Sequence, residues 1–308
     1  MSGKRGGWSA AQSGERPHQG DEVGHEQGLG FAQLEVELGG GAPGARLGLC
    51  AEPLHGAGGG AQLAWRAGEA FPAASTIKVF VLQALFELVA SGGLALTDQR
   101  TVRAADLVTG SGVLKALTPG RDYSLHDLAT LMIIVSDNTA TNVLIDVVGV
   151  DAVNACVQSR GWTATHLAGK LQTAQAQAGT KPSRSVTSPA DLGDYFARLW
   201  RGELLPGALT ATCQAIYRRQ QHTDLGRALG YDPYSVELGA APWRVASKSG
   251  SIRGVRNDAG VFEFEDSRTP LVLVVMTQGC ADERFHPNNL GAQVVGKAAA
   301  AAFGVLAP

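Results

Sequence analysis

The pattern of apolar and polar residues divides the chain into two ends that contain strands and a helical middle. Short apolar or alternating segments bounded by glycine and charge predict strands at 46–51 and 61–66, and again at 244–249, 258–265 and 271–277. We therefore expect an α+β fold, in which an antiparallel sheet with flanking helices is built from both chain ends and an all-helical subdomain is inserted between them.

Helix boundaries are indicated by capping residues. Ser124 is followed three residues later by Asp127, an arrangement that resembles a capping box, and Ser188-Pro189 combines an N-cap with proline in the first turn. Glycines follow most of the apolar periodic segments and mark their ends. The expected helices are 31–38, 75–90, 124–134, 140–148, 151–160, 287–303 and one that begins at Ser188.

The same patterns divide the chain into three parts. Residues 1–28 are rich in glycine, glutamine, serine and charge, so we expect a disordered tail. Residues 29–70 and 235–308 are expected to form an α/β subdomain. Residues 71–234 are expected to form the helical subdomain.

Charge and length exclude two classes of partner. The 308 residues carry 26 Lys and Arg against 28 Asp and Glu, so the net charge of −2 provides no basic field for nucleic acid. The longest apolar stretch, Val79–Ala90, contains Gln83 and Glu87 and is shorter than the roughly 20 residues of a membrane span. We expect a monomer that acts on a small molecule, without nucleic acid and without a membrane span.

The first residues do not resemble a secretory signal, because they carry charge but no continuous apolar segment. Two alternatives follow: either the protein is cytoplasmic, or the natural start differs from the one given.

The four cysteines are far apart and form no CxxC pair, and the seven histidines are dispersed. We therefore expect buried free thiols, no metal site and no cofactor. The cysteines are Cys50, Cys156, Cys213 and Cys280.

Three short motifs could carry chemistry, although each also has an ordinary structural explanation. Ser75-Thr76-Ile77-Lys78 could be a helix N-cap and a first-turn lysine. Ser136-Asp137-Asn138 could cap the next helix, and Lys248-Ser249-Gly250 could be a protective charge on an edge strand.

The catalytic interpretation gives each motif a part in one reaction. A lysine in the first helical turn opposes the helix dipole, but it shares a face with the residue three positions earlier, so Lys78 could take the Ser75 hydroxyl proton. Ser136 could relay a proton, and the Asn138 amide could bind a substrate carbonyl. Lys248 would lower the pKa of Lys78 and attract an anionic substrate.

In this order and at these spacings, the motifs resemble those of the class A β-lactamase and penicillin-binding serine hydrolase family. The resemblance runs from Phe31 to Phe303 and includes Phe71-Pro72, Asn142 and the Ser251 that follows the third motif. It implies a transpeptidase-like fold. Members of this family are usually extracytoplasmic.

The resemblance also implies roles for individual residues. Ser75 would be the acylated nucleophile and Lys78 its general base. The backbone N–H groups of Ser75 and Ser251 would form the oxyanion hole. The residues expected to bind the substrate carboxylate are Ser249, Ser251 and Arg256.

One departure from the family concerns the loop before Ser188. Class A β-lactamases carry a glutamate there, within E-x-x-L-N, that activates the deacylating water. Here residues 152–190 contain neither Asp nor Glu, Leu171 stands near the glutamate's place, and Gln175 near the asparagine's. We expect acylation with slow deacylation. The alternatives are a DD-peptidase-like or esterase-like hydrolase, and a non-catalytic binder of β-lactams or peptidoglycan fragments.

Overall fold

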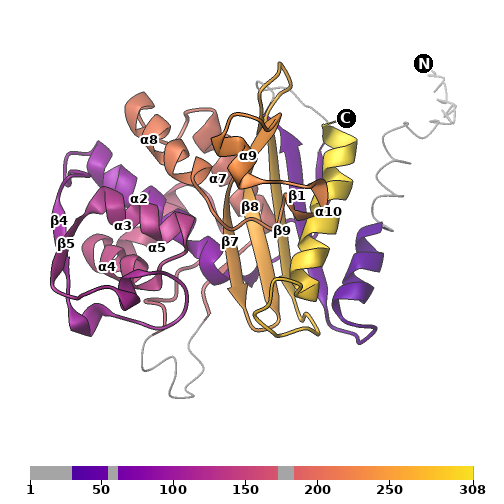
Figure 1. Cartoon of the computed structure of the whole chain (residues 1–308), viewed down its shortest axis with the longest axis horizontal. Helices are drawn as coiled ribbons and strands as arrows, with labels where there is room; N and C mark the ends of the chain where they lie inside the picture. The colour runs from indigo at the N-terminus through magenta and orange to yellow at the C-terminus, as the bar shows by residue number, and fades with distance from the viewer. Residues whose placement is uncertain (1–29, 55–61, 173–183, 308) are drawn as a thin grey trace, which may run out of the picture.

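Five antiparallel strands from both ends of the chain form the central sheet of the computed structural model, in the order β2-β1-β9-β8-β7 (Figure 1). The structure describes residues 30–54, 62–172 and 184–307, so the predicted tail at 1–28 lies outside the described residues. The α+β arrangement expected from the sequence is confirmed. The strands are β1 (Arg46–Pro53), β2 (Leu63–Trp65), β7 (Trp243–Ile252), β8 (Val255–Phe264) and β9 (Leu271–Gln278).

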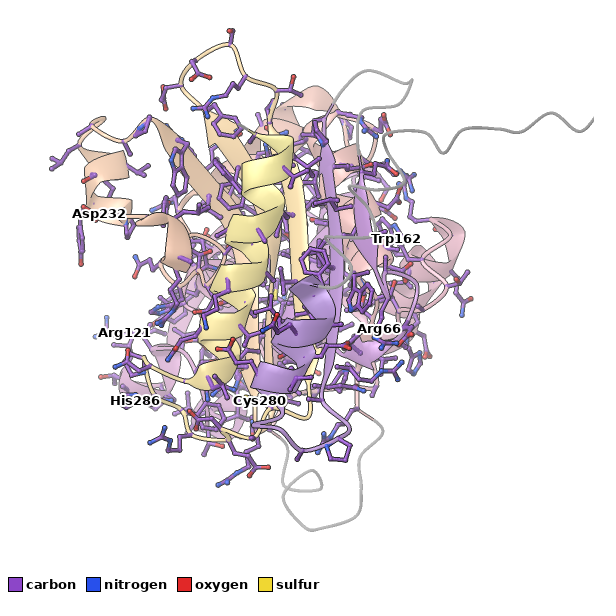
Figure 2. All side chains as sticks on the ribbon, turned by 90° about the vertical axis from the view of Figure 1, so that its right-hand side faces the viewer. Arg66, Arg121, Trp162, Asp232, Cys280 and His286 are labelled. Atoms are coloured by element: carbon purple, nitrogen blue, oxygen red, sulfur yellow. The ribbon has the colours of Figure 1, made fainter. Side chains whose placement is uncertain are left out.

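Two helices cover one face of this sheet, and Figure 2 shows them side by side in front of the strands. They are α10 (Leu290–Leu306) and a helix over residues 30–38. Strand alternation divides β9 between two cores: Leu273 and Val275 pack with α10, whereas Val272 and Val274 pack on the opposite face.

The opposite face is covered by a helical layer around the largely apolar helix α2, whose residues 79–82 are completely buried. Among the described residues, no single helix is long and apolar enough to cross a membrane, although the bent pair α4 and α5 meets both criteria together. The helices of this part of the chain are α2 (Lys78–Ala90), α3 (Leu125–Ile134), α4 (Asn138–Val148), α5 (Val150–Ser159), α7 (Pro189–Trp200), α8 (Gly207–Arg218) and α9 (Pro233–Glu237).

Short strands and turns, which the apolar pattern did not predict, complete the inserted segment. Their two to four residues are too few to show a period. The strand pairs are β3 (Phe71–Pro72) with β6 (Val186–Thr187), and β4 (Gln99–Val102) with β5 (Arg121–Ser124). The 3-10 turns are η1 (Ala74–Ile77), η2 (Ala104–Asp106), η3 (Leu114–Ala116) and η4 (Arg227–Leu229).

Side-chain caps fix the helix starts that the sequence predicted. Ser124 Oγ accepts from the Asp127 N–H at 3.0 Å, and Ser188 Oγ accepts from the Asp191 N–H at 3.0 Å. The helix expected from Ser75 begins instead as the turn η1, which continues directly into α2. Ser75 therefore lies in a tight turn whose geometry is set by its neighbours.

The cysteines are free thiols, as expected: Cys156, Cys213 and Cys280 are buried and Cys50 is partly buried. Burial raises the pKa of the Cys213 thiol to about 12, so it stays protonated and unreactive.

Candidate active site

The turn that carries Ser75 rests directly on strand β7. A Cβ at Gly250 would lie 2.9 Å from the backbone nitrogens of both Ser75 and Thr76, closer than atoms can approach. Glycine is therefore required at this point of β7, and its small size lets the helix start contact the strand. The first and third sequence motifs meet at this contact.

Lys78 connects the first motif to the second. Its side chain is fully buried, and Nζ donates to the Ser136 carbonyl oxygen at 2.7 Å, the Ser136 Oγ at 3.0 Å and the Asn138 Oδ1 at 2.9 Å. The Ser136 hydroxyl is thus held where it can exchange a proton with Lys78.

The second motif is both a helix cap and part of the site. Asp137 Oδ1 accepts from the Ala140 N–H at 3.0 Å and caps α4, while Ser136 is held in the left-handed region at a φ of 54°. Such a conformation is unfavourable for serine and is typical of functional sites. The motif is therefore a helix cap through Asp137 and part of the site through Ser136.

A further segment, Gly110-Ser111-Gly112, wraps around the second motif and was missed by the sequence analysis. Ser111 Oγ donates to the Ser136 carbonyl oxygen at 2.6 Å. A Cβ at Gly112 would lie 2.3 Å from the Asp137 carboxyl group, so this close approach also requires glycine. The two glycines that flank Ser111 are the sequence feature from which this segment could have been predicted.

Lys248 adds a second buried amine, and Nζ donates to the Ser249 carbonyl oxygen at 2.5 Å. Burial lowers the pKa of Lys248 to about 7, against the opposing attraction of Asp258. Burial, and next the positive charge of Lys248, hold the pKa of Lys78 well below its usual range, although Asp137 opposes this. A lowered pKa makes the neutral form of Lys78, which can accept a proton, more accessible.

The lowered pKa of Lys248 predicts that the free energy of unfolding rises between about pH 7 and pH 9. In this window the unfolded chain keeps the Lys248 proton, whereas the folded chain, with a pKa of about 7, has released it. Stability then increases with pH, by at most about 1.4 kcal/mol per unit for one such group. Above that window the thiols of Cys50, Cys156 and Cys213, whose pKa values are raised to about 12, act in the opposite direction.

Urea denaturation at several pH values measures this effect, and Lys248→Met provides the comparison because it removes the titrating amine. We expect a smaller slope of stability against pH in the variant. Equal slopes in the two proteins would contradict the assignment of the shift to Lys248.

The motifs surround a cleft of about 1640 Å³. None of its described lining residues is Asp or Glu, whereas three are Lys or Arg, so the lining itself has an excess of positive charge. Two of these cations are paired with carboxylates outside the lining, Lys170 with Asp146 and Arg253 with Glu283. Of the predicted site residues, Ser75, Ser136, Asn138, Ser249 and Ser251 line it. Its titratable lining side chains are Lys170, Arg184, His222 and Arg253.

A model of the β-lactamase enzyme family matches residues 36–306. The chain belongs to this family. It is a serine β-lactamase-like hydrolase that acts on a small-molecule substrate.

Individual relatives agree with this assignment. The β-lactamase L2 of Stenotrophomonas maltophilia is 34% identical over 227 residues, which cover 72% of this chain and 71% of the relative. The crystal structure of a β-lactamase from Sphaerobacter thermophilus gives a TM-score of 0.76 at 30% identity and covers 91% of this chain and 98% of that one. A leucine-to-glutamate variant of PBP-A, solved as an acyl-enzyme complex with penicillin G, gives 0.73 at 26% identity, with coverage of 90% and 96%.

The loop that departs from the class A β-lactamase pattern is anchored to α4. The Asn142 side chain accepts from the Leu171 N–H at 2.8 Å and donates to the Leu171 carbonyl oxygen at 2.8 Å. This pair of hydrogen bonds holds Leu171 at the cleft, which it lines. Gln175, the predicted counterpart of the asparagine, lies outside the described residues.

Arg256, for which the family resemblance implied a contact with the substrate carboxylate, is nearly buried in the structure. It does not line the cleft, only 4% of it is exposed, and its guanidinium donates to the carbonyl oxygens of Ile252, Val255 and Arg284. These contacts use three of the five N–H groups of the guanidinium. Arg253, at the tip of the same hairpin, does line the cleft.

Proposed function

We propose that β-lactams, or related amides and esters, acylate this hydrolase at Ser75, and that the acyl-enzyme deacylates slowly. The observation that carries the proposal is the cleft itself. Ser75 lines it, Lys78 with its lowered pKa lies buried one helical turn further along, and none of the described lining residues is a carboxylate.

In the proposed acylation, neutral Lys78 removes the proton from the Ser75 hydroxyl as its oxygen attacks the substrate carbonyl. The new oxyanion is bound by the backbone N–H groups of Ser75 and Ser251, a kind of contact that is usually a large part of the rate enhancement. Ser136 then passes its hydroxyl proton to the departing nitrogen and takes in exchange the proton that Lys78 had removed from Ser75, through the hydrogen bond from Lys78 Nζ to Ser136 Oγ. Lys248 keeps the local potential positive when it is protonated.

Deacylation needs a water molecule on the open face of the ester and a group that removes its proton. Leu171 offers only an apolar side chain to the cleft. A positioned general base contributes about 10²–10⁴-fold, so its loss favours a long-lived acyl-enzyme.

The charge of the cleft supports a substrate that bears a carboxylate, which we propose is bound by Ser249, Ser251 and a cation of the wall. Because its side chain is 78% exposed, Arg253 should contribute only what exposed ion pairs do, about 0.2–1 kcal/mol. We expect Arg253→Ala to slow acylation by penicillin G about 2- to 5-fold and to leave acylation by a neutral nitrophenyl ester unchanged.

Arg256→Ala is the comparison for this measurement. It removes carbonyl contacts of the hairpin, so it should affect both substrates equally. A loss confined to penicillin G in Arg256→Ala, with none in Arg253→Ala, would restore the carboxylate role to Arg256.

Intact-mass measurement minutes after mixing with penicillin G tests the proposal, and most of the protein should carry one acyl group. Turnover of a chromogenic cephalosporin separates a hydrolase from a binder that is only trapped. Because the cleft lacks a carboxylate among its described lining residues, a DD-peptidase-like or esterase-like activity is the second candidate, and D-alanyl peptides and simple esters test it.

A further inference from the structure

Asn257 lies next to the nucleophile turn but belongs to none of the three motifs. It is fully buried on β8, where it pairs across the ladder with Gly250 of β7. Cross-strand partners project from the same face of a sheet. Because Gly250 has no side chain, the Asn257 amide reaches past it to the segment that leads into Ser75.

The contacts of the Asn257 amide join that segment to the sheet. Its Nδ2 donates to the carbonyl oxygens of Pro72 at 2.8 Å and Ala73 at 3.2 Å, both immediately upstream of Ser75. Its Oδ1 accepts from the Thr277 N–H of β9 at 2.9 Å. The donor and acceptor ends are therefore both used, which fixes the orientation of the amide.

The Ala73 carbonyl oxygen also forms the base of the nucleophile turn. It accepts from the Thr76 N–H at 3.1 Å and from the Thr76 Oγ1 at 2.7 Å. Any displacement of this carbonyl moves the turn, and with it the Ser75 N–H, relative to β7. The strand residue next to Gly250 is Ser251, which supplies the second N–H of the proposed oxyanion hole.

We propose that Asn257 is a positioning residue that sets the separation of the two oxyanion-hole N–H groups. This inference rests on the proposed acylation at Ser75. The amide holds the turn that carries one donor against the strand pair that carries the other. Catalysis is sensitive to such placement, because removal of one oxyanion donor costs about 10²–10³-fold and a displacement of about 1 Å can cost about 10²-fold.

Asn257→Asp is the most informative variant, since it keeps the shape and the acceptor for the Thr277 N–H but replaces the donor that faces two carbonyl oxygens. We expect the rate of acylation by penicillin G to fall about 10- to 100-fold. The affinity for phenylboronic acid, which forms a tetrahedral adduct with a reactive serine, should fall by a similar factor. Asn257→Ala, which introduces no buried charge, should show the same two losses.

Asn154→Asp is the matched control. Its amide also donates to a backbone carbonyl and accepts from a backbone N–H, both of Leu167, at 3.0 and 2.9 Å. Asn154 lies on α5. We expect Asn154→Asp to have a lower Tm but an unchanged acylation rate. Tm values of all variants, with rates measured well below them, separate positioning from loss of fold.

The outcomes distinguish the two proposals. If the unmodified protein neither gains an acyl group from penicillin G nor hydrolyses it, the proposed function is wrong and this inference is overturned with it. If the unmodified protein is acylated but folded Asn257→Asp or Asn257→Ala reacts at the same rate and binds phenylboronic acid equally well, the inference alone is overturned.

Discussion

Replacing Ser75 by alanine is expected to eliminate covalent labelling by penicillin G. The variant lacks the only oxygen that the proposal allows to attack the β-lactam carbonyl, and removal of a serine nucleophile can cost about six orders of magnitude in rate. The fold should persist, because the change deletes one partly exposed hydroxyl from the turn on β7. Intact-mass spectrometry should show the unmodified mass under conditions that label the starting protein.

Ser159→Ala is the control for this experiment, because its hydroxyl also makes a local contact, to the Cys156 carbonyl oxygen at 2.8 Å, on the helix α5. Labelling should be complete in that variant. If Ser75→Ala still gains one acyl group, another residue is the nucleophile and the proposed roles of Lys78 and Ser136 fail with it.

Much of the fold could be predicted, because helix caps and apolar patterns involve residues that are close together in the sequence. The caps at Ser124 and Ser188 form hydrogen bonds within one turn, so the sequence alone contains both partners. The uninterrupted apolar run of β9 likewise indicates a strand with two buried faces. Elements of two to four residues, such as β3 and β6, depend on pairing between distant segments and left no such signal.

The candidate site was predictable in its motifs but not in its supporting contacts. Lys78 reaches Ser136 and Asn138 across about sixty positions, and the order of the motifs was enough to group them. The contacts of Arg256 with carbonyl oxygens depend instead on how the β7–β8 hairpin and the segment around Arg284 are placed in the fold. The spacing of the sequence motifs does not reveal this placement. Asn257 is the clearest case, since its partners at Pro72 and Ala73 lie more than 180 positions away.

Leu171→Glu is expected to accelerate deacylation by about 10²–10⁴-fold, the usual contribution of a positioned base. The hydrogen bonds from Asn142 to the backbone of residue 171 do not involve the replaced side chain, so the new carboxylate should face the cleft. Leu171→Gln has a similar length but no basic group, and it should leave deacylation slow. Intact-mass time courses measure the acylated fraction, and turnover of a chromogenic cephalosporin measures the rate.

The unmodified protein provides the sharpest test of slow deacylation, since it should show a stoichiometric burst of product followed by slow turnover. If instead the free enzyme predominates while substrate is hydrolysed at about 1–10³ s⁻¹, a base other than a loop carboxylate must activate the water. Among the described residues that line the cleft, His222 has the side chain best suited to that task, because an imidazole nitrogen can act as a proton acceptor. His222→Gln would then convert rapid turnover into accumulation of the acyl-enzyme, whereas with slow deacylation from the start it should leave the acylated fraction unchanged.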